Sequence, residues 1–167
     1  MAATTTDRIE KKTVLRAPAD RVWRAISDSQ QFGRWFGVEF DGPFVAGGRL
    51  TGRIVPTQVD PAVAKAQEPY TGMAFELTVE RIEPMRLFSF RWHPFAVDAD
   101  VDYTTEPTTL VVFELAEVPG GTSLVISESG FDHIPLARRA KAFASNEQGW
   151  AIQLTLIAQY VAANSAA

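Results

Sequence analysis

The sequence predicts an α+β fold in which a curved antiparallel sheet of about six strands wraps around one long C-terminal helix, with two short helices after the first strand. Three observations lead to this prediction. Apolar residues alternate along residues 8–16 and in several runs between residues 73 and 130, as they do in strands with one buried face. Two short segments of helical period lie within residues 18–37, and a longer one fills the C-terminal third.

Apolar and polar residues that alternate with a period of two predict the strands after the two short helices. Residues 73–79 alternate strictly, and the sequence EPM at 83–85 ends that run as a hairpin turn would. The remaining strands are predicted at residues 40–55, in two pieces around a Gly-Gly turn, and at 87–93, 109–117 and 122–130. The residues that share one face within these strands are Phe75, Leu77, Val79, Phe88, Phe90, Trp92, Val111, Phe113, Leu115, Leu124, Ile126 and Glu128.

The helices follow from apolar spacings of three and four. Pro18 suits the first turn of a short helix that ends near Asp28, and the aromatic-rich residues 29–37 predict a second one. The C-terminal helix carries a stripe that includes Trp150 and Leu154. Ser145, with Gln148 three residues later, resembles a capping box that would divide this helix in two.

Two segments lack any such period, and we expect them to be loops. Residues 56–71 contain three prolines, and residues 94–107 are polar. Long loops are uncommon unless they have a function, so both are candidates for a lid or a cavity rim. Residues 8–163 are expected to form one domain, with disordered residues at 1–7 and 164–167.

Composition excludes several classes of function. The 167 residues carry a formal net charge of -4 without a basic stripe, so no nucleic-acid partner is expected. The chain has no cysteine, which excludes disulfides, thiolate nucleophiles and cysteine-bound metal clusters. It has neither an apolar signal segment at the N-terminus nor a run of about 18 apolar residues, so we expect a cytoplasmic protein without membrane insertion.

Four segments in order carry a resemblance to a known family. They are IEKKTVLRAPADRVWRAISD, FRWHP, GGTSLVISESGF and NEQGWAIQLTLIAQYV, and together they extend over nearly the whole chain, from about residue 8 to residue 163. The chain resembles the START-like (SRPBCC) superfamily, and within it the family related to the C-terminal domain of the heat-shock protein 90 ATPase activator. The resemblance implies a helix-grip fold with a hydrophobic cavity between sheet and C-terminal helix, a small hydrophobic ligand, and the chaperone as a further candidate partner.

Aromatic residues on the inner faces are the candidates for the cavity wall, because small-molecule sites are lined by aromatic side chains with a few polar groups. The predicted lining residues are Phe75, Phe90, Trp92, Phe113, Glu128, Trp150 and Leu154. Gly149 precedes Trp150, where it either leaves room for a ligand or lets a strand approach the helix; close packing is the expected cause.

Glu128 is the one charged residue in phase with an apolar strand face. A buried carboxylate without partners costs several kcal/mol, on the order of the penalty for any buried charge, so it needs hydrogen bonds or a cation. It could orient a polar ligand group or act as a general acid or base. The structural alternatives are a bulge before Gly130 that turns the side chain outward, or an ion pair with an arginine such as Arg53.

No metal or cofactor is predicted. Asp98, Asp100 and Asp102 alternate as calcium ligands do, but Tyr103 and Thr109 stand where a calcium loop requires glycine and glutamate. His93 and His133 are each isolated in sequence, so surface or capping roles are expected for both.

Three hypotheses for function therefore remain open. The first is a non-catalytic protein that binds a small apolar molecule. The second is a cyclase- or hydrolase-like enzyme in which Glu128 acts with a histidine, Tyr70 or Tyr103. The third is a module that acts on a chaperone. The sequence determines neither the ligand nor the oligomeric state.

Overall fold

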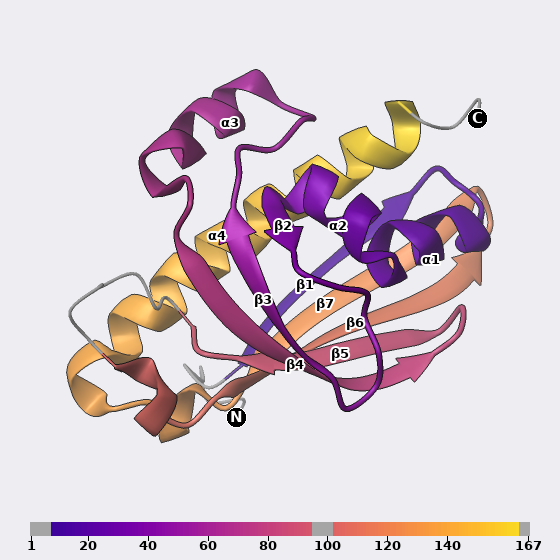
Figure 1. Ribbon diagram of the computed structural model, residues 1–167. Helices are drawn as coiled ribbons and strands as arrows, with labels where there is room; N and C mark the ends of the chain where they lie inside the picture. The colour runs from indigo at the N-terminus through magenta and orange to yellow at the C-terminus, as the bar shows by residue number, and fades with distance from the viewer. Residues whose placement is uncertain (1–7, 95–101, 164–167) are drawn as a thin grey trace.

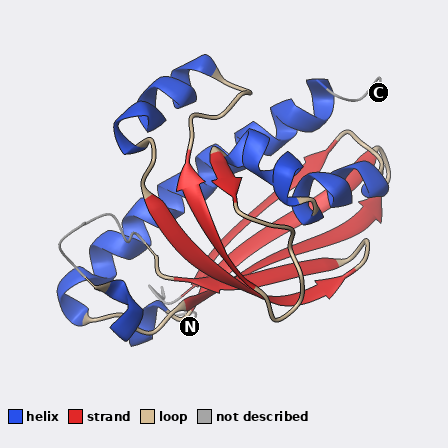
Figure 2. Ribbon diagram, in the orientation of Figure 1, coloured by secondary structure: helices blue, strands red, loops and turns tan. Residues whose placement is uncertain are grey.

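A computed structural model describes residues 8–94 and 102–163 of the chain. Seven antiparallel strands form one curved sheet in the order β1-β7-β6-β5-β4-β3-β2, and the long helix α4 runs across its inner face (Figure 1). The helices α1 and α2 lie at one end of the sheet (Figure 2). The predicted fold class, a helix-grip α+β domain, is confirmed, with seven strands rather than about six.

The elements agree with the sequence pattern except within residues 40–55. There the first predicted strand piece is wrong, because β2 ends at Phe40 and residues 41–48 connect it to β3 without forming a strand. The strands are β1 Arg8–Leu15, β2 Val38–Phe40, β3 Arg49–Ile54, β4 Ala74–Glu83, β5 Leu87–Trp92, β6 Thr109–Val118 and β7 Gly121–Ser129. The helices are α1 Ala19–Ser27, α2 Ser29–Phe36, α3 Pro61–Gln67 and α4 Leu136–Ala163, with short 3-10 turns η1 Glu68–Tyr70, η2 Tyr103–Thr105 and η3 Phe131–His133.

The inner face of the sheet holds the core. Val79, Phe88, Phe113, Leu124 and Ile126 are each completely buried, as the alternation of apolar residues predicts. The hairpin between β4 and β5 turns at residues 84–86, which overlap the turn predicted from EPM at 83–85.

The two short helices are fixed by specific contacts. Asp28 begins α2 by accepting hydrogen bonds from the amides of Gln30 at 2.9 Å and Gln31 at 3.2 Å, as an N-cap residue does. A Cβ added to Gly33 would lie 2.1 Å from the carbonyl oxygen of Val38. Glycine at this position therefore allows α2 to pack directly on the start of β2.

The C-terminal helix is continuous, so the predicted break at Ser145 is wrong. α4 runs for 28 residues without interruption. The apolar stripe continues on both sides of Ser145 and packs against the sheet, with Ala142, Trp150 and Ile157 at most 2% exposed. Packing of one amphipathic face contributes more to a helix than a local capping preference does.

Residues 56–71 are not the predicted loop, because they contain α3 and η1. Asp60 caps α3 by accepting from the amides of Ala62 and Val63, and Pro61 occupies the first turn. The pattern was missed because α3 has no buried residue, and hence no apolar stripe to reveal it.

Three predictions concern residues that lie partly or wholly outside the described ones: the predicted loop 94–107, through residues 95–101, and the disordered segments 1–7 and 164–167. Within the described part of the predicted loop, η2 covers Tyr103–Thr105. Among the described residues, no helix is both long and apolar enough to cross a membrane.

Candidate functional site

Glu128 lies on β7, and its side chain is completely buried between the inner face of the sheet and α4. Its strand stays in register with β1 and β6 through Ser129, so no bulge precedes Gly130. The interpretation that Glu128 turns outward is therefore wrong. The suggested pair with Arg53 is also wrong, because Arg53 is exposed on β3 and the hydrogen bonds of Glu128 come from other residues.

Four neutral side chains donate hydrogen bonds to the Glu128 carboxylate. The indole Nε1 of Trp92 lies 2.8 Å from Oε2, and that of Trp150 lies 2.8 Å from Oε1. The Thr109 hydroxyl donates to Oε2 at 2.6 Å, and Asn146 Nδ2 lies 2.9 Å from Oε1 and 3.1 Å from Oε2. An ionised carboxylate only accepts hydrogen bonds and has about four lone-pair sites, so this set of donors satisfies it without a cation.

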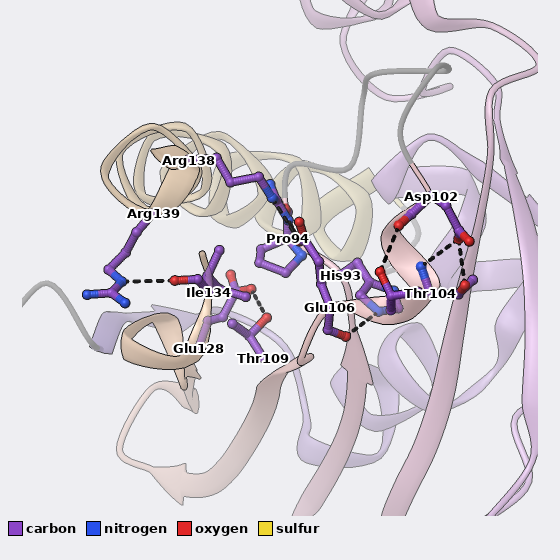
Figure 3. A network of polar contacts seen from close by, with 11 residues as sticks. His93, Pro94, Asp102, Thr104, Glu106, Thr109, Glu128, Ile134, Arg138 and Arg139 are labelled. Atoms are coloured by element: carbon purple, nitrogen blue, oxygen red, sulfur yellow. Dashed lines mark hydrogen bonds and ion pairs between the residues drawn. The ribbon is translucent and has the colours of Figure 1, made fainter. Parts of the chain in front are cut away.

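We call these five residues, Trp92, Thr109, Glu128, Asn146 and Trp150, the carboxylate cluster. Trp92 and Thr109 are directly opposite each other on β5 and β6, and Glu128 is on the next strand, β7. Asn146 and Trp150 are four residues apart on α4 and therefore lie on one face of that helix. Figure 3 shows Glu128 turned toward Thr109 beneath the helix. The cluster thus joins three adjacent strands to α4.

A pocket of about 340 Å³ lies beside the carboxylate cluster, at the volume where small-molecule sites begin. Trp92, Asn146 and Trp150 belong to both the pocket wall and the cluster. The complete lining comprises Phe36, Ile54, Tyr70, Met73, Trp92, Ser145, Asn146, Gly149, Trp150 and Gln153. The pocket therefore lies between α4, the end of α2 and the chain that connects β3 to β4.

Three aromatic rings form the deeper wall of this pocket. Trp92 stacks on Trp150 with ring centroids 5.7 Å apart and an interplanar angle of 30°. The ring of Phe36 is tilted by 60° to both, at 6.3 Å from Trp92 and 6.0 Å from Trp150. Tyr70 is 48% exposed and contributes a fourth ring nearer the solvent. Hydrogen bonds to Glu128 fix both indoles, so this wall is formed before any ligand arrives.

Two glutamine amides meet at the carbonyl oxygen of Phe36. Gln67 Nε2 at the end of α3 donates to it at 3.1 Å, and Gln153 Nε2 on α4 donates at 3.2 Å. The same bond orients the amide of Gln153, because its nitrogen must face the carbonyl. The other atom of that amide, Gln153 Oε1, is buried and has no hydrogen-bond partner among the described residues.

Gly149 lies in the pocket wall. A Cβ added there would meet no atom within 4 Å. The expectation that Gly149 allows close packing against a strand is therefore wrong, because the space beside it is open.

The structure distributes the predicted lining residues over the core and the pocket. Trp92 and Trp150 line the pocket with Glu128 behind them, whereas Phe90 and Phe113 are at most 1% exposed within the core. Phe75 packs edge-on against Trp92 at 6.1 Å and reaches a second groove of about 530 Å³, and Leu154 is partly buried against the core. Sequence reasoning missed Thr109, Asn146 and Gln153. Only the spacing of Asn146 from Trp150 could have indicated one of them.

Two candidate partners of Glu128, His93 and Tyr103, lie in a separate network at the end of β5 and the start of β6, which Figure 3 shows around His93. The third, Tyr70, lies in the pocket wall and is not among the donors to Glu128. His93 Nε2 lies 3.1 Å from the carbonyl oxygen of Glu106. The Glu106 carboxylate pairs with Arg138, which also donates to the carbonyl oxygen of Pro94 at 2.9 Å and lies 4.8 Å above the Tyr103 ring. Among the described residues, none of the four donors to Glu128 is a histidine or a tyrosine.

The remaining titratable candidates have structural contacts. Asp102 caps η2, and its hydrogen bonds from the hydroxyl and amide of Thr104 lower its pKa. Asp98 and Asp100, its partners in the rejected calcium pattern, lie outside the described residues. His133 is exposed beside Asp132, with 3.3 Å between Nδ1 and the carboxylate.

The curved antiparallel sheet with the long C-terminal helix across it defines a helix-grip protein of the START-like class. The sequence model of the family described as "Activator of Hsp90 ATPase homolog 1-like protein" matches residues 16–162. The chain belongs to this family. None of the curated proteins compared with the chain matches it.

Solved structures show the same fold at low sequence identity. Protein MLL2253 from Mesorhizobium loti is 19% identical with a TM-score of 0.67, over 92% of this chain and 96% of that one. A protein from Arthrobacter aurescens is 16% identical with a TM-score of 0.71, over 97% and 90%. DynU16, from the dynemicin biosynthetic locus, is 21% identical with a TM-score of 0.66, over 95% of this chain and 48% of its own.

Proposed function

We propose that this protein binds a small, largely apolar molecule in the pocket between α4 and the β3–β4 connection. The observation that carries the proposal is the wall of Trp92, Trp150 and Phe36, which is preorganised by the hydrogen bonds to Glu128. Rigid aromatic surface binds an apolar ligand without a large ordering cost. The predicted lining residues Trp92 and Trp150 would contact the ligand directly.

Glu128 would then be a positioning residue rather than an acid or base. Its two oxygens accept from four donors, and the side chain is completely buried. A general base must reach the proton that it removes, with a free lone pair. The geometry therefore favours binding over cyclase- or hydrolase-like catalysis at this residue.

The chaperone partner that the family description names stays a prediction for this chain. The exposed large apolar side chains are spread over β1, α4, the 3-10 turn η1 and two connections; they are Val14, Val45, Tyr70, Met85, Leu136 and Ile152. Because they belong to separate parts of the fold, they do not by themselves favour a docking surface over the pocket.

The test is a titration with N-phenylnaphthylamine, a neutral fluorescent hydrophobe, followed by its fluorescence and by the indole N–H resonances of Trp92 and Trp150. Saturable binding that shifts both resonances is expected. Gly149→Leu would fill the open space beside Gly149 and abolish binding. The substitution should not weaken the helix, because leucine has the higher helix propensity by roughly 0.7 kcal/mol.

Ala151→Leu is the matched control, because Ala151 is exposed two residues further along α4. It adds the same side chain outside the pocket and should leave the affinity unchanged. If wild type shows no saturable binding, or if Gly149→Leu binds as wild type does, the proposed function is wrong.

A further inference from the structure

The pocket has a negative charge behind its wall, on Glu128, and no positive charge in its lining. Glu128 lies directly behind the wall, and all four side chains that donate to it are neutral. None of the ten residues that line the pocket is charged. A buried charge is weakly screened, so its field reaches the adjacent pocket. That field favours a positive ligand group.

The walls that face this field are aromatic. Phe36, Tyr70, Trp92 and Trp150 all line the pocket, and the faces of aromatic rings attract cations, most strongly in tryptophan. Both indoles donate their N–H groups to the same carboxylate. Hydrogen bonds to an anion polarise the donor group, which makes the indole rings more electron-rich.

We propose that the pocket selects a molecule with an ammonium group attached to an apolar body. The inference rests on the proposed function, because it specifies the ligand class of the same pocket. The positive group would lie against the indole wall in front of Glu128. Fatty acids and other anionic hydrophobes would be disfavoured by the same field.

The test compares two probes of nearly equal shape on the wild-type protein: phenyltrimethylammonium, which is a cation, and tert-butylbenzene, which is neutral. Binding is followed by the indole N–H resonances of Trp92 and Trp150. The cation should bind about 3-fold to 30-fold more tightly, the range expected for a cation at an aromatic face. Equal binding, or tighter binding of tert-butylbenzene, would overturn the cation preference and leave the proposed function standing. Absence of binding by both probes and by N-phenylnaphthylamine would overturn the two together.

Glu128→Gln identifies the source of the preference, because it removes the charge at nearly constant size. The affinity for phenyltrimethylammonium should fall more than that for tert-butylbenzene, so that the ratio of the two affinities approaches one; a change common to both probes reports the altered positions of the indoles. A preference that survives in folded Glu128→Gln would contradict the role of the carboxylate. If this variant does not fold, the comparison on wild type decides the inference without it. Gly149→Leu should lose both probes, and Ala151→Leu should keep both.

Discussion

At the scale of single residues, Glu128 shows how a buried charge is accommodated without a countercharge. Two indoles, one amide and one hydroxyl, from β5, β6 and α4, all point at one carboxylate. Each donor would itself be left unpaired if the carboxylate were removed. The cluster is therefore mutually dependent, and the two tryptophans of the pocket wall depend on it for their orientation.

We expect Glu128→Gln to lower the free energy of unfolding by about 2–4 kcal/mol, because the amide NH₂ would face donors and leave at least one of them without an acceptor. Urea unfolding monitored by circular dichroism measures the change. Glu114→Gln, an exposed site on the neighbouring strand β6, should change stability by less than about 0.5 kcal/mol. Equal stability of the two variants would mean that the hydrogen bonds to Glu128 contribute nothing.

At the scale of elements, α3 is a surface helix held by polar contacts at both ends, with Val63 partly buried against the core. Asp60 caps its first turn and also accepts from Gln159 Nε2 of α4 at 3.2 Å. At the other end, Gln67 accepts from the amide of Thr57 at 2.7 Å and donates to Phe36. The chain that follows α3 supplies Tyr70 and Met73 to the pocket, so these polar contacts position part of the pocket wall.

The contribution of Asp60 to holding α3 in place should change with pH only under acidic conditions. The hydrogen bond from Gln159, together with those from the amides of Val63 and Ala62, lowers the pKa of Asp60 below its ordinary value of 3.8. Because the folded pKa is depressed, the stabilising contribution is complete above the ordinary pKa and is lost as the pH falls through the folded value.

Amide resonances of Ala62 and Val63 report this titration directly. Their midpoint should lie below 3.8 in the wild-type protein, and Gln159→Leu should move it upward, toward the ordinary value, by removing the largest cause of the shift. In Asp60→Asn the transition should disappear. A wild-type midpoint at or above the ordinary value would contradict this account.

At the scale of the whole molecule, contacts between distant parts of the chain close α4 onto the sheet. The carboxylate cluster joins the middle of the helix to three strands, and Arg138 joins its first turn to the connection between β5 and β6. The side chains of Arg138 and Glu106 are only 18% and 14% exposed. Partly buried pairs of this kind are screened less than surface pairs.

Arg138→Met should therefore lower the free energy of unfolding by about 2–3 kcal/mol, because it leaves the Glu106 carboxylate partly buried without its cation. Arg24→Met removes an exposed pair with Asp20 on α1 and should cost less than about 0.5 kcal/mol. Arg138→Lys should lie between wild type and Arg138→Met, because lysine lacks the planar guanidinium that also covers Tyr103. A loss no larger than that of Arg24→Met, measured by urea unfolding, would show that the first turn of α4 is held by other contacts.

The sequence by itself determined most of the strands, the two short helices, the stripe of α4 and the phase that Glu128 shares with Leu124 and Ile126. These features follow from local periodicity, because a residue's face within a strand or helix depends only on its neighbours along the chain. It did not reveal α3, whose polar contacts at both ends leave no apolar pattern, or the continuity of α4 through Ser145, where packing overrides a local capping signal.

Only the tertiary structure decided what surrounds Glu128 and where the pocket lies. Trp92, Thr109, Asn146 and Trp150 come from three elements that are far apart in sequence, and their meeting point depends on how α4 lies on the sheet. For the same reason the sequence does not show that Trp92 lines the pocket whereas Phe90 and Phe113 lie in the core. All three residues face inward by alternation, and their different surroundings depend on how the helices lie on the sheet.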